Sequence, residues 1–406
     1  MRIAAVGITP PGTKASGGIS AGIQLMRHIA ERCETAMYVM ADRDEDVVEG
    51  KLRISLRRAS SAVLPVERWV PRAVTTMSWR ADVEEWLREF SPDIVHLHNA
   101  HPVGALRNAA RTCDRLRIPY VISTHGFVEF NDFALGYGAA RWQRPLLKWL
   151  IRDPLIKVAS GAARVMMLSS FEESIITGMG VAKDRLRIVT NGVDPYFLET
   201  VPRVELERLT VRFALPADRP LLLFVGNHTS NKGLDVLLRA LTLMQEKALA
   251  IIAGAIRSKT DNERLIESCG LDLADPRFKF TDFLTKEELR ALYRSVDVFV
   301  FPSRADTLPL VILEAMASSR PVVASNVGGI PFEVTNQTGI LVPPGDPGQL
   351  AAALDRMCAS LQTRQIMGEA GRRRVLDHFS WDAAADAAIA VYEEICSGGA
   401  RPGAAV

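Results

Sequence analysis

The chain has 406 residues, of which 24% are charged and 48% hydrophobic, and its formal net charge is +2. Such a composition is typical of a folded globular protein, and the length suits two domains rather than one core. The nearly balanced charge argues against nucleic acid as a partner. The five cysteines lack C-x-x-C spacing, which argues against a disulfide framework or a cysteine-bound zinc and fits a reducing cytoplasm.

The N-terminal stretch MRIAAVGITPPG is a short apolar run ended by prolines, and we interpret it as a first strand rather than a signal peptide. No window approaches the ~18 apolar residues that a membrane-spanning helix needs. Short apolar runs then alternate with segments of helical periodicity, which predicts the α/β class with helices on both faces of parallel sheets. The expected strands are 2–8, 93–98, 119–124, 163–169, 220–226, 248–254, 296–303 and 320–325.

These strands form two series, which predicts two doubly wound, Rossmann-like domains that face each other across a cleft. We expect the boundary near residue 200, so that the domains span 1–200 and 201–380. A last helix, 381–395, is expected to pack back towards the N-terminal domain, and 396–406 to form a flexible tail. In doubly wound sheets ligands bind at the carboxyl ends of the strands, so the loops that follow strands are candidate sites.

The loop after the first strand contains Gly17 and Gly18, which allow the backbone to approach a ligand closely. The alternative is a flexible surface loop. A complete G-x-G-x-x-G is absent, so a nicotinamide site is disfavoured.

Histidines follow the next two expected strands. His125 could hydrogen-bond a sugar hydroxyl or help to move an acceptor proton, and Gly126 lies beside it; a structural histidine is equally compatible. His96, His98 and His101 raise the question of a metal. We expect His96 and His98 to alternate across their strand and point to opposite faces of the sheet, which disfavours a metal site.

In the second half, Lys232 lies in the loop between the strand 220–226 and a helix that begins near Gly233. A cation at this place can neutralise a phosphate, although an isolated loop lysine is more often solvated. The spacing is not that of a P-loop.

The stretch SRADTLPLVILEAMASS carries carboxylates at Asp306 and Glu314. Pro309 suits the first turn of a helix, which would leave the N–H groups of Leu310 and Val311 available to an anion such as a diphosphate. If every position between the carboxylates were helical, the rise would be about 12 Å, more than the roughly 5–9.5 Å of glycosidase acid pairs. We therefore favour two carboxylates that bind hydroxyls on either side of a phosphate. The alternative is a turn former at Asp306 and an ordinary helix residue at Glu314.

Together these motifs resemble the retaining glycosyltransferases of family 4, the group 1 transferases with the GT-B fold. The resemblance covers most of the chain, and the motifs follow the family's order. They are GGI after the first strand, THG, NGVD, VGN…KG, the string from Asp306 through EAMA, RPVVASNVGGIPFEV and GILVPPGDPGQLAAAL.

The resemblance implies an acceptor-binding N-terminal domain and a nucleotide-sugar-binding C-terminal domain. Glu314 would hold the donor ribose, and Asp306 would contact the transferred sugar. Lys232, with the amides of Leu310 and Val311, would hold the diphosphate.

In the N-terminal domain, Gly17 and Gly18 would border that diphosphate, while His125 and Gly126 would line the acceptor side. The family uses no metal and no cofactor besides the nucleotide-sugar co-substrate. The acceptor hydroxyl attacks from the same face through an oxocarbenium-like transition state, and the leaving diphosphate takes its proton. Catalysis would therefore rest on charge stabilisation and positioning, with His125, Lys232 and Asp306 as the catalytic residues.

Departures from the family pattern occur at the donor site. Asp306 stands where glutamate is usual, and Pro309 where glycine is usual, as in a D-N-L-P subset of the family. Asn227 stands where an arginine often helps Lys232, which weakens diphosphate binding or moves that role to Arg257 or another cation. Asp282 replaces the usual glycine near the nucleobase.

Two basic, apolar segments of the first domain suit an anionic membrane surface. The alternative is an amphipathic helix packed on its own sheet. The first segment carries Lys51, Arg53, Arg57, Arg58, Arg68 and Arg72, and the second Arg141, Trp142, Arg144, Lys148, Trp149 and Arg152.

The sequence thus predicts a cytoplasmic, metal-independent, retaining hexosyltransferase, with peripheral attachment to the inner face of the cell membrane as a hypothesis. It would move a hexose-type sugar from a UDP or GDP sugar to a glycan or lipid-linked acceptor in surface polysaccharide or glycolipid biosynthesis. One alternative is a small soluble sugar or sugar-phosphate acceptor. Another is an inactive sugar-nucleotide-binding subunit.

Overall fold

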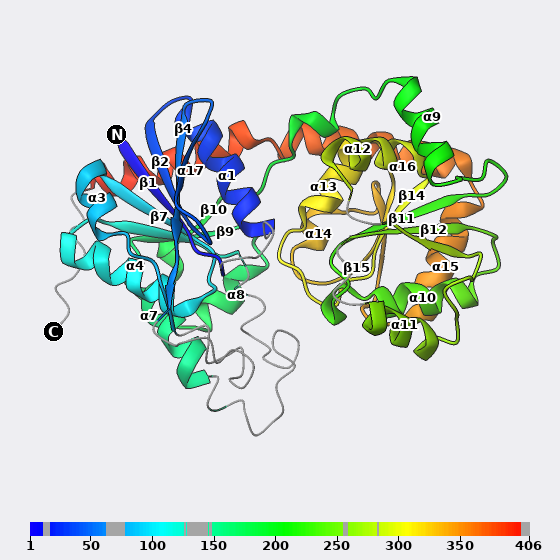
Figure 1. Cartoon of the computed structure of the whole chain (residues 1–406), viewed down its shortest axis with the longest axis horizontal. Helices are drawn as coiled ribbons and strands as arrows, with labels where there is room; N and C mark the ends of the chain where they lie inside the picture. Colours follow the sequence, from blue (N-terminus) through cyan, green and yellow to red (C-terminus); the bar gives the residue numbers. More distant parts are fainter. Residues whose placement is uncertain are drawn as a thin grey trace. The chain divides into compact units, whose positions relative to one another are not determined.

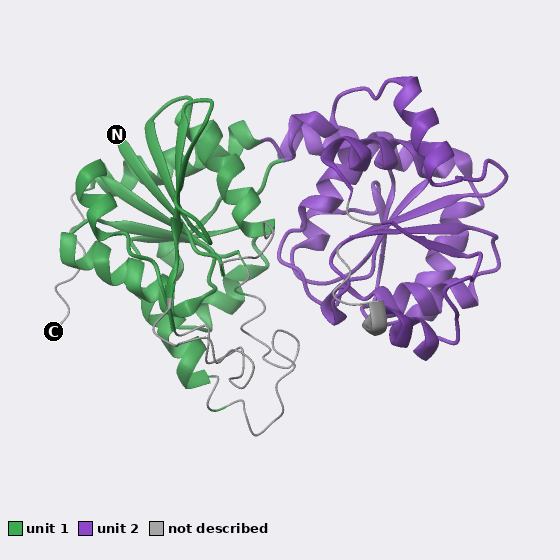
Figure 2. Cartoon of the chain, in the orientation of Figure 1, with its two compact units in different colours: residues 1–192, 381–406 green, residues 193–380 purple. Residues whose placement is uncertain are grey.

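The computed structural model describes residues 1–10, 17–61, 78–125, 127, 145, 148–254, 259–281 and 284–398. The chain divides into two compact units, drawn in two colours in Figure 2. Unit 1 comprises residues 1–192 and 381–406, and unit 2 comprises residues 193–380. The chain first passes from unit 1 to unit 2 between residues 192 and 193, a few residues before the boundary that we expected near residue 200. The chain returns to unit 1 for its last helix.

Unit 1 is built on an eight-stranded sheet in the order β10-β9-β8-β7-β1-β2-β4-β3. Its pairs are parallel except for the antiparallel β3–β4 hairpin. The order reverses at β1, which creates a topological switch point between β1 and β7. The strands are β1 (Arg2–Gly7), β2 (Glu34–Ala41), β3 (Glu45–Glu49), β4 (Leu52–Arg58), β7 (Ile94–His98), β8 (Tyr120–Ser123), β9 (Arg164–Met167) and β10 (Leu186–Ile188), and β5 (Ser60–Ser61) pairs separately with β6 (Trp79–Arg80).

Helices cover both faces of this sheet (Figure 1). On one face α4 and α7 pack together over a core that includes Val6, Val95 and Leu97. On the other face α1 packs against α17, the helix that returns from unit 2. The helical segments are α1 (Gly17–Ala30), α3 (Glu84–Phe90), α4 (Val103–Leu116), η3 (Lys148–Arg152), α7 (Asp153–Gly161), α8 (Glu172–Thr177), η4 (Lys183–Arg185) and α17 (Trp381–Ser397).

Unit 2 has a six-stranded parallel sheet in the order β13-β12-β11-β14-β15-β16. Its order reverses between β11 and β14, so the loops that follow these two neighbouring strands meet at the switch point. The strands are β11 (Leu221–Val225), β12 (Leu249–Ala253), β13 (Phe278–Phe280), β14 (Val298–Phe301), β15 (Val322–Ser325) and β16 (Gly339–Val342).

Two apolar clusters cover the two faces of the unit 2 sheet, which explains its nearly continuous apolar strands. One cluster includes residues of α9, α12 and α13, and the other residues of α10, α11 and α15. The helical segments are η5 (Pro195–Phe197), α9 (Arg203–Arg212), η6 (Ser230–Lys232), α10 (Leu234–Leu243), α11 (Lys259–Ser268), α12 (Lys286–Ser295), α13 (Leu310–Ala317), α14 (Ile330–Glu333), α15 (Pro347–Cys358) and α16 (Leu361–His378). The two sheets confirm the predicted α/β class with two Rossmann-like domains.

Where it is described, the first basic segment of the sequence analysis forms part of the sheet of unit 1. Arg53, Arg57 and Arg58 lie on β4, which pairs with β2 on one side and β3 on the other, and Arg53 and Arg58 are exposed. Arg57 forms an ion pair with Asp46 of the neighbouring strand, at 2.9 Å. Residues 62–77, with Arg68 and Arg72, lie outside the described residues.

Candidate active site

The loops after β11 and β14 bring Lys232 and Asp306 together. Lys232 ends the short η6 turn before α10, and Asp306 lies between β14 and α13. The Lys232 Nζ donates to Asp306 Oδ2 at 2.5 Å, and the two side chains are 24% and 15% exposed. The ammonium also lies 5.5 Å from the centre of the Phe301 ring. A half-buried cation of this kind can receive an anion if its carboxylate partner moves.

Backbone contacts and a second ion pair fix the same two loops against each other. The Arg304 guanidinium binds both Asp235 carboxylate oxygens, at 2.7 and 2.6 Å, in the fork geometry that arginine favours. The Arg304 N–H donates to the carbonyl of Asn231 at 2.7 Å. Gly233 has φ +70°, and a Cβ there would lie 1.9 Å from the Pro302 carbonyl oxygen. The close approach of the loops therefore requires glycine at this position.

The helix α13 begins beside Asp306 and points its first N–H groups out of the helix. Pro309 occupies the N-cap, one position before the first helical turn where the sequence analysis placed it. Leu310 and Val311 are the first two helical residues, so no earlier carbonyl of the helix can accept from their N–H groups. The first turn carries no acidic side chain. Its positive dipole end is thus available to an anion.

Glu314 lies one turn further along α13 and is held by a buried tyrosine. The Tyr293 hydroxyl of α12 donates to Glu314 Oε2 at 2.9 Å. Burial raises the pKa of the Glu314 carboxyl to about 7, although the hydrogen bond from Tyr293 opposes this rise. Glu314 is therefore a partly buried carboxyl that titrates near neutral pH, and not an ordinary exposed helix residue. Tyr293 was not among the site residues predicted from the sequence.

A third loop, after β15, packs against the backbone of Asp306. Gly328 has φ +55°, and a Cβ there would lie 1.7 Å from the Asp306 carbonyl oxygen. Glu333 of α14 is fully buried, and neither of its carboxyl oxygens has a hydrogen-bond partner among the described residues. Burial, followed by the charge of Asp306, raises its pKa well above the ordinary value. The motif GGIPFEV contains this residue, but the motif alone does not reveal a neutral carboxyl near Asp306.

In unit 1, Gly18 and His125 lie next to each other. A Cβ on Gly18 would lie 2.2 Å from Asn99 Oδ1 and 3.1 Å from the His125 Cβ, so any larger residue at the start of α1 would have to displace the Asn99 side chain. Gly17, in contrast, has no atom within 4 Å of such a Cβ. Burial lowers the pKa of His125 to about 4, which makes it a neutral hydrogen-bonding group at physiological pH. Gly126 lies outside the described residues.

The expectation for His96 and His98 was wrong. Residues two apart on a strand share a face, and the ring centroids of these two histidines lie 3.8 Å apart. His96 Nδ1 contacts the Tyr392 hydroxyl at 2.6 Å, and its Nε2 contacts Ser123 Oγ at 2.7 Å. His98 is fully buried and lies between the rings of His96 and His125. Within the described residues, no group of three or more His, Cys, Asp or Glu side chains could hold a metal ion.

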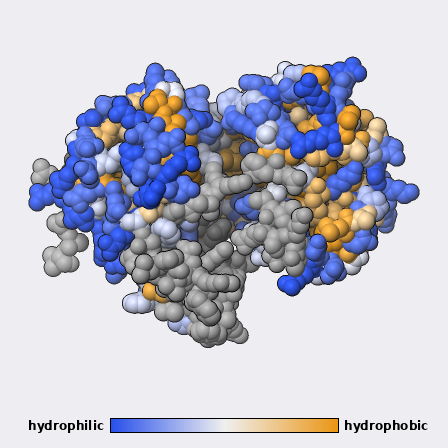
Figure 3. Space-filling view, in the orientation of Figure 1, coloured by the Kyte–Doolittle hydropathy of each residue, from blue (hydrophilic) through white to orange (hydrophobic). Residues whose placement is uncertain are grey.

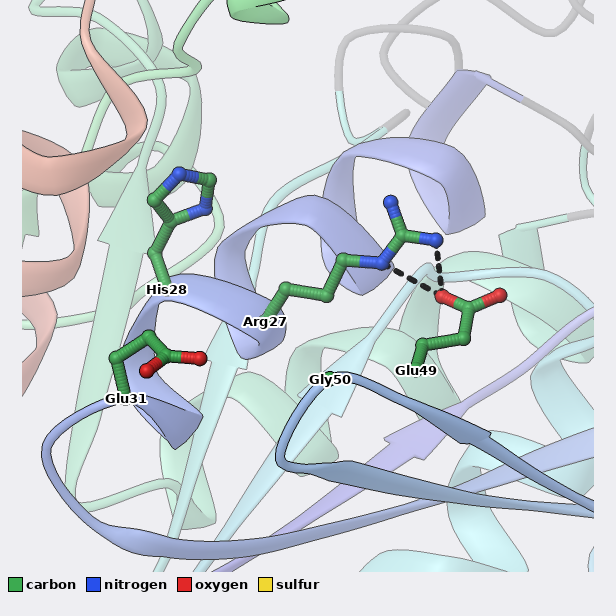
Figure 4. A pocket seen from close by; sticks show the side chains of 5 residues that line it. All are labelled: Arg27, His28, Glu31, Glu49 and Gly50. Atoms are coloured by element: carbon green, nitrogen blue, oxygen red, sulfur yellow. Dashed lines mark hydrogen bonds and ion pairs between the residues drawn. The ribbon is translucent and has the colours of Figure 1, made fainter.

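A surface cavity of about 470 Å³ lies elsewhere on unit 1. Figure 4 shows Arg27 reaching from α1 to Glu49, while His28 and Glu31 lie apart from this pair. The Arg27 Nε donates to Glu49 Oε2 at 2.6 Å, and Glu31 pairs with Lys51 at 2.9 Å. These residues lie at the end of α1 remote from Gly17, and their charges neutralise one another, so the cavity is a weaker candidate than the loops of unit 2.

The surface seen in Figure 3 is mainly hydrophilic, with apolar residues in scattered patches. No helix in the described part of the chain is long and apolar enough to cross a membrane. Of the basic and tryptophan residues named in the second basic segment, the structure describes Lys148, Trp149 and Arg152. Trp149 is 68% exposed.

Two family models match successive parts of the chain. The model described as Glycosyltransferase Family 4 matches residues 17–197, and the model described as Glycosyl transferases group 1 matches residues 219–360. A D-inositol 3-phosphate glycosyltransferase of Xylanimonas cellulosilytica is 32% identical over 310 residues, which are 74% of this chain and 72% of the relative. The chain belongs to the group 1 glycosyltransferases of family 4.

Solved structures show the same fold as this glycosyltransferase. Sucrose-phosphate synthase from Thermosynechococcus elongatus has a TM-score of 0.75 and 22% identity, covering 98% of this chain and 100% of its own. Anabaena HepE in complex with UDP-glucose has a TM-score of 0.73 and 18% identity, with coverages of 98% and 100%. WaaG, a glycosyltransferase involved in lipopolysaccharide biosynthesis, has a TM-score of 0.73 and 17% identity, with the same coverages. These likenesses confirm the GT-B fold.

The departures of this glycosyltransferase from the family pattern lie on the loops described above. Asn227 is exposed in the loop after β11, and its carbonyl accepts from the Thr229 N–H at 2.8 Å. Arg304 is a cation on the adjoining loop, but Asp235 engages its guanidinium. Arg257 and Asp282 lie outside the described residues.

Proposed function

We propose that the protein is a retaining, metal-independent hexosyltransferase that uses a nucleoside-diphosphate sugar, with UDP or GDP as the nucleotide. The observation that carries this proposal is the meeting of Lys232, Asp306 and the first turn of α13 at the switch point of unit 2. A cation and a helix N-terminus together suit a diphosphate. The complex of HepE with UDP-glucose supports a donor of this class.

Donor binding would begin by opening the ion pair between Lys232 and Asp306. The diphosphate oxygens would accept hydrogen bonds from the Lys232 ammonium and from the N–H groups of Leu310 and Val311. Asp306, released from the lysine, would accept hydrogen bonds from hydroxyls of the sugar. Glu314, one turn along the same helix, would accept from the ribose hydroxyls.

The transfer step would depend on charge stabilisation. As the bond between the anomeric carbon and the diphosphate oxygen breaks, negative charge grows on that oxygen, beside Lys232 and the helix N-terminus. The acceptor hydroxyl forms its bond to the anomeric carbon from the same face and gives its proton to the leaving diphosphate. The products are the glycosylated acceptor and a nucleoside diphosphate. His125 of unit 1, neutral at physiological pH, would hydrogen-bond the sugar or the acceptor.

For the acceptor we propose a glycan or lipid-linked hydroxyl in surface polysaccharide or glycolipid biosynthesis. The likeness to WaaG and the exposed Trp149 beside Lys148 support this class and a peripheral contact with anionic membrane. Flotation with vesicles that contain anionic lipid tests the contact. Trp149→Ala should weaken it, whereas Val211→Ala, which shortens an 81% exposed apolar side chain of unit 2, should not. Equal flotation of both variants and the wild type would remove Trp149 from the proposal.

A small soluble sugar phosphate is the second candidate acceptor. The D-inositol 3-phosphate glycosyltransferase, which is 32% identical, favours it. Formation of a glycosylated soluble product without lipid would decide for this candidate.

Thermal unfolding with a panel of nucleoside diphosphates and their sugar conjugates tests the donor proposal. A ligand at 100 times its dissociation constant adds about 2.7 kcal/mol, which raises the midpoint by several degrees. The shift should occur with one nucleotide and be lost in Glu314→Ala. Absence of any shift, together with no release of nucleoside diphosphate from any donor, would overturn the proposal. Binding without turnover would favour the inactive-subunit alternative.

A further inference from the structure

Tyr293 is a buried residue whose ring position is fixed from two sides. It lies on α12, is fully buried, and its ring centroid is 5.7 Å from that of Phe197 and 5.6 Å from that of Phe299. The contact with Phe197 is edge-to-face, at 84° between the ring planes, and the contact with Phe299 is tilted, at 54°; together they hold the ring in place. The hydroxyl is therefore held at one point, 2.9 Å from Glu314 Oε2 and 3.3 Å from the Val311 carbonyl oxygen.

Both contacts of this hydroxyl belong to α13. Glu314 is the proposed ribose ligand, and Val311 is one of the two residues whose N–H groups would bind the diphosphate. We propose that Tyr293 is a positioning residue of the donor site, which orients the Glu314 carboxylate for the ribose hydroxyls and transfers its own hydrogen bond to the Val311 carbonyl when that carboxyl is protonated. The inference rests on the proposed function, because it assigns Glu314 to the donor.

The hydrogen-bonding capacity of a carboxyl explains why the Tyr293 hydroxyl can contact Glu314 in both of its protonation states. An ionised carboxylate only accepts, so Tyr293 donates to Oε2 and leaves the remaining lone pairs of Glu314 for the two ribose hydroxyls. A protonated carboxyl carries a donor of its own. It can then donate to the Tyr293 oxygen, whose hydrogen turns to the Val311 carbonyl. The protonated state has fewer acceptor positions and should bind ribose more weakly.

Several charged groups surround Glu314 from the packed elements. Burial raises its pKa to about 7, the Tyr293 hydrogen bond lowers it, the Asp194 charge raises it and the Lys286 charge lowers it. From α16, the Arg372 guanidinium reaches the Ala317 carbonyl at the end of α13. Burial raises the pKa of Tyr293 itself well above its ordinary value, so its proton stays in place at neutral pH.

Donor affinity should therefore rise with pH through about 7 and reach a plateau above it. Tyr293→Phe removes the group that favours the ionised carboxylate, so the Glu314 pKa should rise and the midpoint should move to higher pH. If the hydrogen bond shifts the pKa by about one unit, the variant should bind about fivefold more weakly at pH 7 and recover most of its affinity at high pH.

Calorimetric titration with UDP-glucose between pH 5.5 and 9 measures this midpoint, with GDP-glucose as a second probe. Both phosphates of these donors are esterified, so the charge of the diphosphate does not change in this range. The control is Tyr120→Phe, which also removes a buried hydroxyl that donates at 2.9 Å, but to the Val158 carbonyl of unit 1. It should leave the midpoint unchanged. Glu314→Gln should remove the change in affinity that is centred near pH 7.

A higher midpoint in Tyr293→Phe alone would support the inference. Equal midpoints in Tyr293→Phe and the wild type, or a pH dependence that persists in Glu314→Gln, would overturn it and leave the donor site intact. Failure of the wild type to bind either donor would overturn the donor site and the inference with it. If Tyr293→Phe does not fold, the ¹³Cζ resonance of Tyr293 in the wild type should move with the same midpoint as the affinity, and a constant resonance would overturn the inference.

Discussion

Lys232 and Asp306 neutralise each other at 2.5 Å across two neighbouring loops. This pair is half-buried, so its attraction is only partly screened by water. A diphosphate must take Lys232 from Asp306, and the carboxylate that it displaces remains close by as a like charge. Asp306 therefore opposes binding of the nucleotide. In the proposed mechanism it also promotes binding of the sugar, because it accepts hydrogen bonds from the sugar hydroxyls.

Asp306→Asn should separate these two effects. Without the carboxylate, Lys232 is free and one like charge disappears, so UDP should bind roughly tenfold more tightly, which corresponds to about 1.4 kcal/mol. Sugar transfer should nevertheless fall, because the amide accepts hydroxyl hydrogen bonds less well than a carboxylate. Calorimetric titration with UDP and release of UDP from UDP-glucose measure the two quantities.

Two variants complete that experiment. Lys232→Met should weaken UDP binding at least about tenfold, since a charged hydrogen bond is lost. Asp272→Asn changes the net charge as Asp306→Asn does, but Asp272 precedes β13, an edge strand, whereas Asp306 follows the central strand β14. Asp272→Asn should change neither the affinity for UDP nor the release of UDP from UDP-glucose. Weaker UDP binding in Asp306→Asn would show that the aspartate positions Lys232 rather than competing for it.

At the residue scale, the sequence identified the side chains that follow strands but not the ones that support them. Lys232 and Asp306 could be found because they follow adjacent strands of a doubly wound sheet. Tyr293 could not, since it lies inside a helix whose apolar face already explains a buried aromatic residue. The misplacement of His96 and His98 came from applying the alternation of a strand to residues that are two positions apart.

The C-terminal helix α17 joins unit 1 through one buried contact and several exposed ones. The Tyr392 hydroxyl meets His96 Nδ1 at 2.6 Å in a fully buried position. Glu394 pairs with Arg164 and Arg187, each at 2.7 Å, with a 39% exposed side chain. Burial lowers the pKa of His96 to about 3, so this ring is neutral and its bond to Tyr392 does not change with pH near neutrality.

Tyr392→Phe should therefore destabilise unit 1 more than Glu394→Gln. The first change leaves a buried ring nitrogen without its partner, at a cost of about 1–3 kcal/mol. The second removes partly exposed ion pairs worth about 0.2–1 kcal/mol. Urea unfolding at pH 7.5 compares the two variants, and an equal m-value would show that only stability changed.

The contacts of Tyr392 and Glu394 also differ in how their contributions to stability change at acid pH. Hydrogen bonds from Arg164 and then Arg187 lower the pKa of Glu394, so its contribution is present above the ordinary carboxyl pKa and is lost as pH falls through the lowered value. A larger loss in Glu394→Gln than in Tyr392→Phe at pH 7.5 would contradict the argument from burial.

Most strands with long apolar runs were predicted from the sequence, whereas the apolar strand β2 (Glu34–Ala41) and the strands of mixed character were missed. The strands around Leu221–Val225 and Val298–Phe301 are buried on both faces and read as continuous apolar stretches. The strand Leu52–Arg58 alternates apolar residues with the polar Arg53, Ser55 and Arg57, and it lies near the edge of its sheet. Its arginines suggested a contact with an anionic membrane. Its place beside β2, in contrast, depends on tertiary strand pairing that a local sequence pattern does not contain.

For the whole molecule, the decisive feature is that each unit has its own apolar core. Among the residues that the structure describes, one apolar cluster belongs to unit 1 and two belong to unit 2. The chain crosses between the units twice, between Gly192 and Val193 and between Ser380 and Trp381. Unit 2 is thus inserted into the sequence of unit 1, yet its sheet is complete from β11 to β16. Each core can in principle unfold as its own cooperative unit.

Scanning calorimetry should accordingly resolve two transitions, and a nucleoside diphosphate should raise mainly the one that belongs to unit 2, which holds most of the proposed ligands. Saturation at 100 times the dissociation constant adds about 2.7 kcal/mol, or several degrees at roughly 2–4 °C per kcal/mol. Tyr392→Phe should lower the other transition, which assigns it to unit 1. Of the residues proposed for nucleotide binding, Lys232, Leu310, Val311 and Glu314 lie in unit 2, whereas Gly17 and Gly18, which would border the diphosphate, lie in unit 1. An equal rise of both transitions with UDP would show that residues of unit 1, with Gly18 the first candidate, contribute to nucleotide binding.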